Sequence, residues 1–140
     1  STLSSSSAAS DVYKRRVQTG RLVLQTRGLQ QRDFISLTDV CRVTEYFSVR
    51  HSKSKTTGVF NVGVGMSQSV LEMAQLIQKR CKSVLGFEPL LQFIQEEVNE
   101  QHPLLTYQSN NLAAFGLNSN GLENTTEIDS LLRFCQIAFT

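Results

Sequence analysis

The sequence predicts a mixed α/β domain made of short strands and packed helices. Apolar residues recur at helical spacing in three segments, 36–47, 69–85 and 126–139, and short runs of β-type residues separate these segments. The chain has 140 residues, of which 40% are hydrophobic and 19% charged, as expected for one globular domain. Strands that alternate with helices favour α/β packing, so this fold class is our expectation.

The first half of the chain begins with a Ser/Ala-rich stretch. Residues 1–10 have no hydrophobic pattern, so we expect a flexible tail or the ragged start of a truncated domain, with the folded region at 11–140. Asp11 is suited to cap a short basic helix that runs to Val17. The β-type runs Arg21–Gln25 and Asp33–Ile35 follow. Ser36 then begins a helix whose apolar positions are Leu37, Val40, Cys41, Val43 and Phe47.

The second half opens with a predicted strand at 58–63. Ser69 and Glu72 form a capping box that starts a helix, and Gly86 ends it. Further β-type runs lie at 89–94 and 104–107, and residues 111–115 resemble one helical turn followed by Gly116. The last helix is expected to begin near Thr126, with Asp129 completing a capping pair, and to bury Ile128, Leu131, Leu132, Cys135 and Phe139.

Three cysteines, Cys41, Cys81 and Cys135, lie on apolar helical faces without metal-ligand spacing, which predicts reduced core thiols. No segment approaches the roughly 20 apolar residues of a membrane span, and residues 1–10 lack the apolar region of an export signal. These features favour a cytoplasmic protein that does not enter a membrane.

The net charge of +2 hides an asymmetry between the two parts of the chain. Residues 1–85 carry 13 Lys and Arg against 5 Asp and Glu, whereas residues 86–140 carry one Arg against 7 acids. The basic part is able to attract phosphate, either of a nucleotide or of nucleic acid, although a solvated surface whose two ends attract each other is the favoured explanation. Nucleic acid ranks last among the partners, because only Tyr13 interleaves the basic residues Lys14, Arg15, Arg16, Arg21, Arg27 and Arg32.

Ordinary catalytic and metal-binding patterns are missing from the sequence. It contains no P-loop, no H-E-x-x-H and no nucleophile elbow, and His51 and His102 stand in polar loops without ligand spacing. Gly63-Val64-Gly65 resembles part of a dinucleotide fingerprint, but Gln68 stands where the third glycine is needed. We therefore interpret this segment as a tight turn rather than as a cofactor site, and we assign no catalytic and no metal-binding residue.

One segment is more specific. Gly28, Arg32, Asp33, Phe34, Ile35, Asp39 and Val40 follow in an order that resembles nucleotide-sugar epimerases and dehydratases of the extended short-chain dehydrogenase/reductase class. Segments 58–69 and 105–117 and the terminal helix 127–139 are similar to later parts of the same family. The resemblance implies a partial Rossmann-type epimerase fold, in which residues 11–140 form the C-terminal, substrate-binding region.

The resemblance also implies site residues. The residue matching Arg32 contacts the diphosphate of the nucleotide-sugar, and the strand before it lies along the base, which carries substrate binding over to Val23 and Gln25. Asp33 and Asn61 are expected to organise the fold instead. A guanidinium suits the first of these roles, since it holds phosphate oxygens through two parallel hydrogen bonds.

This chain departs from the family in two ways. Relatives carry a second phosphate-binding Arg near segment 95–101, which here contains three Glu and no Arg. The glycine-rich NAD(P) turn and the Tyr-x-x-x-Lys pair lie upstream in relatives, and Tyr13, Tyr46 and Tyr107 each lack a Lys four residues later. We expect no cofactor in this chain, with NAD or NADP bound by a cofactor domain from the same gene or another chain.

Two functions remain open from the sequence. The first is the substrate-binding part of an NAD(P)-dependent epimerase/dehydratase, inactive as an isolated chain, with the sugar, the nucleotide and the reaction unassigned. The second is a non-catalytic nucleotide- or phosphate-binding regulatory module. In either case, apolar surface that relatives cover with their cofactor domain would favour self-association.

Overall fold

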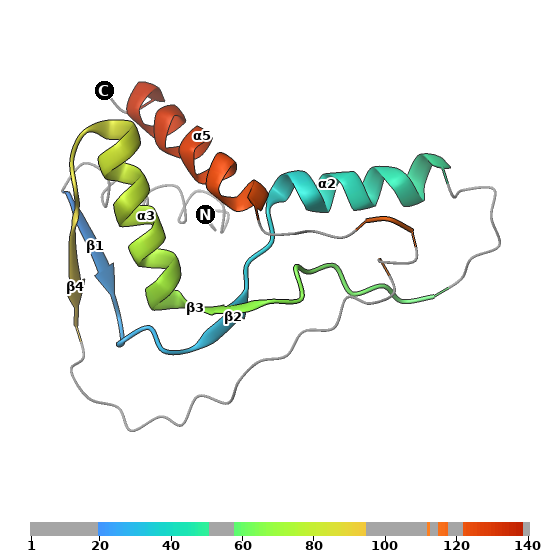
Figure 1. Cartoon of the computed structure of the whole chain (residues 1–140), viewed down its shortest axis with the longest axis horizontal. Coiled ribbons are helices and arrows are strands. Elements are labelled where there is room, and N and C mark those ends of the chain that lie inside the picture. Colours follow the sequence, from blue (N-terminus) through green and yellow to red (C-terminus); the bar gives the residue numbers. More distant parts are fainter. Residues whose placement is uncertain (1–19, 51–57, 95–111, 113–114, 118–121, 139–140) are drawn as a thin grey trace, which may run out of the picture. The chain divides into compact units, whose positions relative to one another are not determined.

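The computed structural model describes residues 20–50, 58–94, 112, 115–117 and 122–138. Short strands and helices alternate along the chain, as the sequence predicts (Figure 1). The elements in order are β1 (Arg21–Leu24), β2 (Gln31–Asp33), α2 (Leu37–Glu45), the π-helical segment η1 (Tyr46–Arg50), β3 (Ser67–Ser69), α3 (Val70–Leu85), β4 (Leu90–Phe93) and α5 (Leu122–Ala138).

The chain divides into two compact units, and each is described by itself. Unit 1 comprises Ser1–Leu29, Val70–Gln101 and Ile128–Thr140, and unit 2 comprises Gln30–Ser69 and His102–Glu127. Among the described elements, unit 1 therefore holds β1, α3, β4 and most of α5. Unit 2 holds β2, α2, η1 and β3.

Unit 1 contains a parallel pair of strands. β1 pairs with β4 in a register that places Val23 opposite Gln92 and Leu24 opposite Phe93. Parallel neighbours need a crossover connection, and α3 supplies one before β4. One further backbone bond lies at each end of this pair, from Leu90 N to Gly20 O at 2.8 Å and from Ile94 N to Leu24 O at 3.0 Å.

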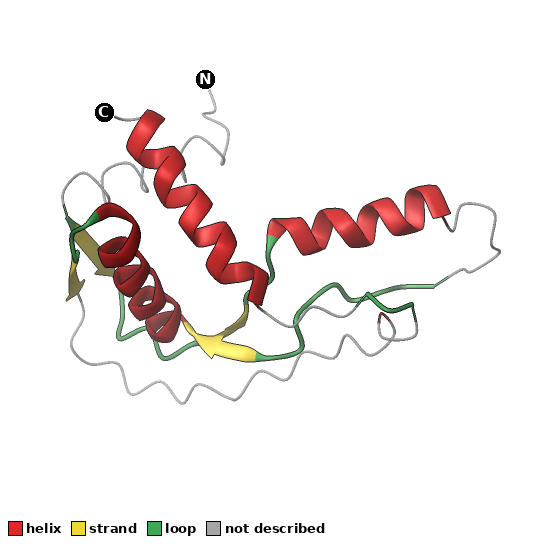
Figure 2. Ribbon diagram, turned by 45° about the horizontal axis from the view of Figure 1, so that its top comes forward, coloured by secondary structure: helices red, strands yellow, loops and turns green. Residues whose placement is uncertain are grey.

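Helices α3 and α5, red in Figure 2, carry the buried hydrophobic residues described in unit 1. Leu132 is fully buried, and Ala74, Cys81 and Cys135 are nearly so. A two-bonded ion pair joins the helices beside this core, from Arg80 Nε to Asp129 Oδ1 at 2.7 Å and from Arg80 Nη2 to Asp129 Oδ2 at 2.5 Å. The Arg80 guanidinium lowers the pKa of Asp129, because its hydrogen bonds favour the carboxylate.

The predicted core positions of the thiols are right for two cysteines and wrong for the third. Burial raises the pKa of Cys81 and Cys135, since an apolar environment disfavours the thiolate. Cys41 is exposed on α2, because Val43 and not Cys41 occupies the buried side of that helix. The prediction that Leu131 is buried is also wrong, since this side chain is 48% exposed.

Gly28 allows the chain to pass close to the first turn of α3. Its φ is +72°, and a Cβ added there would lie 3.0 Å from both Leu24 Cδ1 and Leu71 N. The Gly28 carbonyl accepts a hydrogen bond from Leu71 N at 2.9 Å, which ties the end of the β1 segment to the start of α3. Only glycine combines this backbone conformation with this close approach.

Unit 2 contains an antiparallel pair of strands and a capped helix. β2 pairs with β3, with Arg32 opposite Gln68 and Asp33 opposite Ser67. Ser36 caps α2, as predicted, and its Oγ accepts from Asp39 N at 3.0 Å. Asp39 is almost fully buried and forms an ion pair with Arg42 at 2.6 Å.

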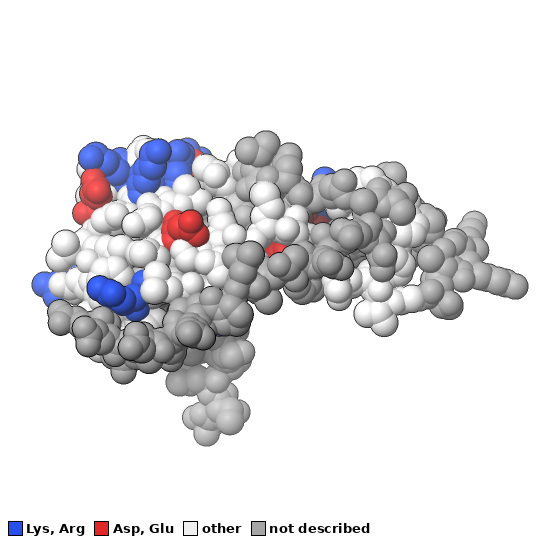
Figure 3. Space-filling view, turned by 60° about the horizontal axis from the view of Figure 1, so that its bottom comes forward, with Lys and Arg blue, Asp and Glu red and all other residues white. Residues whose placement is uncertain are grey.

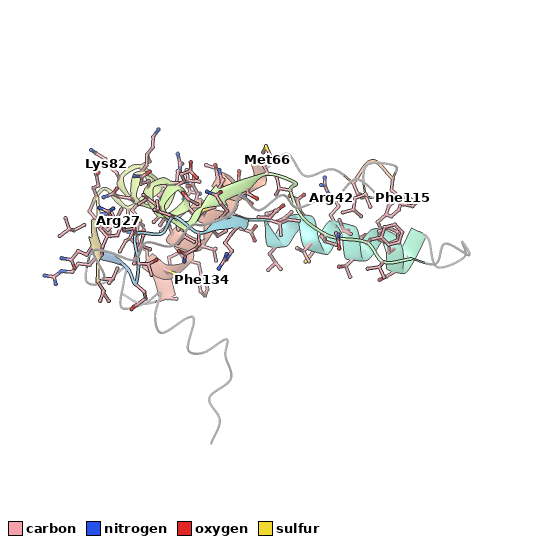
Figure 4. The ribbon with its side chains drawn as sticks, turned by 90° about the horizontal axis from the view of Figure 1, so that it is seen from below. Arg27, Arg42, Met66, Lys82, Phe115 and Phe134 are labelled. Carbon is pink, nitrogen blue, oxygen red and sulfur yellow. The ribbon has the colours of Figure 1, made fainter. Side chains whose placement is uncertain are left out.

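Four aromatic rings pack in the core of unit 2. The ring centroids of Phe47 and Phe60 lie 4.7 Å apart, and those of Phe47 and Phe115 lie 5.3 Å apart. Tyr46 meets Phe115 edge to face at 5.9 Å. These rings pack against the buried residues Val43, Leu112 and Leu117. Figure 4 labels Phe115 beside the end of the α2–η1 segment.

Three predicted elements differ from the structure. The strand expected at 33–35 lies two residues earlier, at β2. Residues 58–63 are not a strand. Phe60 and Val62 pack on the aromatic core, whereas Val59 is 88% exposed. The alternation of buried and exposed side chains therefore comes from packing and not from strand pairing. Helix α5 begins at Leu122 rather than near Thr126, and Asp129 pairs with Arg80 instead of completing a cap.

Other predictions are confirmed or fall on residues that the structure does not describe. Leu85 ends α3 before Gly86, which has a φ of +78°, and β4 lies within the predicted run 89–94. Phe115 N donates to Leu112 O before Gly116, as expected of the predicted helical turn. The predictions outside the described residues are the tail 1–10, the helix 11–17, the loop containing His51, the acidic segment 95–101, the strand 104–107 with His102, and Phe139.

Substituting Gly28 by Ala should destabilise the fold more than the same change at Gly86. Both glycines have positive φ, but a Cβ at Gly86 meets nothing within 4 Å. We expect Gly86→Ala to cost about 1 kcal/mol, from the backbone conformation alone, and Gly28→Ala about 2 to 4 kcal/mol. Urea unfolding followed by circular dichroism measures both; equal losses would contradict the close packing against α3.

The Arg80–Asp129 pair should make stability depend on acid pH. Because folding lowers the pKa of Asp129, its contribution is fully present above the ordinary Asp pKa of about 3.9 and is lost as pH falls through the folded value. Asp129→Asn should therefore be less stable than the native chain at neutral pH, and the difference should shrink in acid. A difference that stays constant from about pH 6 to pH 2 would contradict this assignment.

Candidate functional site

Arg32 lies in the middle of β2, on the exposed side of the β2–β3 pair. Its Nη1 donates to the neighbouring Gln31 carbonyl at 2.8 Å, and no carboxylate of the described residues pairs with it. A guanidinium carries five N–H donors, so most of this group remains available. Gln68, its cross-strand partner, is also exposed, which places two polar side chains on one face.

Asp33, the next residue, has the opposite role and organises the fold, as predicted. Its two carboxylate oxygens accept hydrogen bonds from Val64 N and Gly65 N, both at 2.8 Å. Gly65 has a φ of +78°, so the turn uses a glycine conformation, as expected for this segment. The side chains of a β-strand alternate between its two faces, which explains how Asp33 points into the fold while Arg32 points out.

The hydrogen bonds from Val64 and Gly65 to Asp33 determine whether the Gly63–Gly65 turn can bind a cofactor. Successive backbone N–H groups in a glycine turn form a typical site for a phosphate anion. Here the Asp33 carboxylate already occupies the N–H groups of Val64 and Gly65. The segment that follows is strand β3, whereas a dinucleotide turn leads into a helix. The residues of this turn therefore do not fit the pyrophosphate of NAD.

Contacts from α5 support the segment that leads from β2 into α2. Asn124 Nδ2 donates to the Phe34 carbonyl at 2.8 Å, and Glu127 Oε2 accepts from Leu37 N at 2.8 Å. The Glu127 carboxylate thus satisfies a free N–H group at the start of α2, where a negative charge is favourable. Both residues were missed from the sequence, because they lie 90 positions from their partners.

Val23 and Gln25 lie in unit 1, so the three predicted substrate-binding residues are divided between the two units. Val23 is half-buried on β1, and Gln25 is exposed directly after that strand. The structure thus places Val23 and Gln25 close together along one unit and presents Arg32 in the other.

Basic side chains of the described residues do not form one continuous patch on the face drawn in Figure 3. The blue atoms lie in separate groups, with acidic atoms between them. Lys82 is one example, since it pairs with Glu88 at 2.9 Å. Among the described residues, no three His, Cys, Asp or Glu side chains gather as metal ligands, and no helix is long and apolar enough to cross a membrane.

Replacing the Asp33 carboxylate by an amide should destabilise the chain. The single carbonyl oxygen of Asp33→Asn cannot accept both N–H groups as two charged oxygens do, so we expect a loss of about 1 to 3 kcal/mol. Glu88→Gln is the matched control, because this exposed pair should contribute less than about 1 kcal/mol. Chemical unfolding measures both variants. Similar small losses would show that Asp33 does not hold the turn.

The sequence and fold of the chain are similar to those of known proteins. No family model matches the chain. ADP-L-glycero-D-manno-heptose-6-epimerase of Thiobacillus denitrificans (strain ATCC 25259 / T1) is 36% identical over 63 residues, which are 45% of this chain and 18% of the epimerase. The chain thus spans a minor part of this relative.

Two solved structures have a similar fold. UDP-N-acetylglucosamine 4-epimerase from Methanobrevibacter ruminantium M1, in complex with UDP-N-acetylmuramic acid, superimposes with a TM-score of 0.65 at 17% identity, over 91% of this chain and 38% of that one. MoeE5 in complex with UDP-glucose and NAD gives a TM-score of 0.61 at 15% identity, over 94% and 42%. The chain therefore has a partial Rossmann-type fold similar to that of these enzymes, and part of its sequence is similar to that of an epimerase.

Proposed function

We propose that the chain is the substrate-binding region of an NAD(P)-dependent nucleotide-sugar epimerase or dehydratase, and that Arg32 holds the diphosphate of the substrate. The observation that carries this proposal is the state of Arg32. It is exposed, it has no carboxylate partner among the described residues, and Asp33 anchors its strand. A guanidinium presented in this way is suited to bidentate contacts with phosphate oxygens.

The nature of the ligand is supported by the comparisons. Both solved relatives are complexes with UDP-linked sugars, UDP-N-acetylmuramic acid in one case and UDP-glucose in the other. We propose a ligand of the same class here, with Val23 and Gln25 along the base. NAD is bound in the second of these complexes. In the proposed enzyme the cofactor belongs to a separate cofactor-binding part, since the Gly63–Gly65 turn does not fit it.

The alternative is a non-catalytic nucleotide- or phosphate-binding module with a regulatory role. The Gly63–Gly65 turn, whose Val64 and Gly65 N–H groups are occupied by the Asp33 carboxylate, favours it. The two functions differ in the partner: the enzyme requires a cofactor-binding part, from the same gene or another chain, that carries a glycine-rich strand–turn–helix and Tyr-x-x-x-Lys. Under either function the isolated chain should show no NAD(P)-dependent turnover of UDP-glucose.

Two further expectations belong to this proposal. The three thiols are free, which fits the reducing cytoplasm. Exposed apolar side chains on α5, of which Phe134 is 62% and Ile137 83% exposed, favour self-association of the isolated chain.

Substituting Arg32 should weaken the binding of UDP-glucose. Because hydrogen bonds to charged groups contribute about 1.5 to 3 kcal/mol, Arg32→Ala should reduce the affinity about ten- to hundred-fold. Arg32→Lys should lie in between, since an ammonium keeps the charge without the bidentate geometry. Isothermal titration calorimetry with UDP-glucose measures all three proteins.

Arg133→Ala is the matched control for loss of positive charge, because Arg133 is exposed on α5. It should leave the affinity unchanged. If Arg133→Ala weakens binding as much as Arg32→Ala does, the interaction is general electrostatics and the assignment of Arg32 is wrong. Unchanged binding by Arg32→Ala would also contradict it.

A further inference from the structure

One side of helix α5 carries three large apolar side chains that the fold leaves exposed (Phe134 is labelled in Figure 4). Leu131 is 48%, Phe134 62% and Ile137 83% exposed, whereas Leu132 and Cys135, on the neighbouring side of the same helix, are buried. The exposed residues recur every three positions, so they follow one another along one side of the helix. We refer to Leu131, Phe134 and Ile137 as the α5 stripe.

The α5 stripe carries no charge. From Ser130 to Ala138 the only charged residue is Arg133. After the hydrogen bonds from Arg80, the charge of Arg133 also lowers the pKa of Asp129, so Arg133 lies on the side of the helix that carries Asp129. An exposed apolar surface bordered by polar residues is typical of a protein–protein contact.

The residues of this surface are arranged symmetrically about Phe134. Leu131 and Ile137, which are large and apolar, stand three positions to either side, and the small residues Ser130 and Ala138 stand four positions to either side. In a two-fold contact the same surface of both copies meets, so residue i contacts residue j and residue j contacts residue i. Two antiparallel α5 helices that meet at Phe134 therefore place Leu131 of each copy opposite the partner's Ile137. Antiparallel helices also align their macrodipoles favourably.

The area of the α5 stripe fits a weak dimer. A fully covered Phe side chain buries about 150 to 250 Å², so the exposed parts of the three side chains come to about 300 Å² per copy and about 600 Å² per pair. Stable complexes bury roughly 1,200 Å² or more. A dimer formed through the stripe should therefore be populated only at high protein concentration.

We propose that the α5 stripe is a two-fold interface that binds a second copy of the chain, with Phe134 on the two-fold axis. The self-association expected of the isolated chain is thereby assigned to one helix, one orientation and three residues. The proposal does not rest on the proposed function, because the interface contains no residue of the candidate site. Failure of either proposal therefore leaves the other intact.

Sedimentation equilibrium of the native chain, at about 10 to 500 µM, should show a reversible monomer–dimer equilibrium. Phe134→Glu should weaken dimerisation at least about tenfold, because it places two carboxylates together at the axis. Val59→Glu is the matched control, since Val59 is 88% exposed but belongs to unit 2, and it should dimerise as the native chain does. An equal loss in both variants would overturn the assignment to the stripe. Circular dichroism checks that each variant retains the fold.

Mixtures of variants test the position of the axis. A residue on the axis meets its own copy, so Phe134→Glu mixed with Phe134→Lys should dimerise more tightly than either variant alone. Ile137 meets Leu131 instead, and the two copies of Ile137 are offset by about 9 Å along the helices. Ile137→Glu should therefore be restored by Leu131→Lys and not by Ile137→Lys. Restoration by Ile137→Lys instead would overturn the antiparallel arrangement.

Salt separates the α5 stripe from the charge asymmetry of the chain. Residues 1–85 are basic and residues 86–140 acidic, so two copies are also able to attract each other by charge. Such attraction weakens as ionic strength rises, whereas apolar burial does not. Dimerisation should be at least as strong at about 0.5 M NaCl as at about 0.1 M. Dissociation by salt would overturn the apolar interface, and a native chain that stays monomeric up to about 500 µM would overturn the second copy as the occupant of the stripe.

Discussion

Unit 2 depends on a single carboxylate. Asp33 joins β2 to the turn that precedes β3, through hydrogen bonds to two successive backbone N–H groups at 2.8 Å each. Without these bonds the two N–H groups would need other partners, and three residue pairs of antiparallel ladder are a small basis for a strand pair. The same carboxylate fixes the strand that presents Arg32.

Arg32 and Asp33, which are adjacent and oppositely charged, thus do not pair with each other. The usual expectation for an adjacent Arg and Asp is an ion pair, but the alternation of a strand directs them to opposite faces. Asp33 is used for structure, and Arg32 remains unpaired among the described carboxylates. This separation is what makes Arg32 suitable for an anionic ligand, because a paired guanidinium would have to lose its partner first.

The sequence predicted correctly the elements that depend on residues close together along the chain. These are the Ser36 cap of α2, the end of α3 before Gly86 and strand β1. Residues 58–63 failed as a strand because side-chain alternation there serves packing against Phe47 and Phe115 and not strand pairing. The start of α5 was missed because Asn124 and Glu127 are engaged by Phe34 and Leu37, far away in the sequence.

The candidate site, like the fold, was predictable from the sequence only in part. Arg32, Val23 and Gln25 were predicted from the resemblance to a family, and the structure adds that the Arg32 guanidinium is exposed without a carboxylate partner among the described residues. The pairing of Val23 with Gln92 could not be predicted from the sequence, because it follows from a register between residues 69 positions apart. Parallel register depends on the α3 crossover and is not encoded in either strand alone.

The most direct test of the role of Arg32 is a crystal structure of the chain with UDP-glucose bound. We expect oxygens of the diphosphate to lie within hydrogen-bond distance of the Arg32 guanidinium, with Asp33 still bonded to Val64 N and Gly65 N. A diphosphate bound elsewhere, with Arg32 turned to solvent, would contradict the central claim.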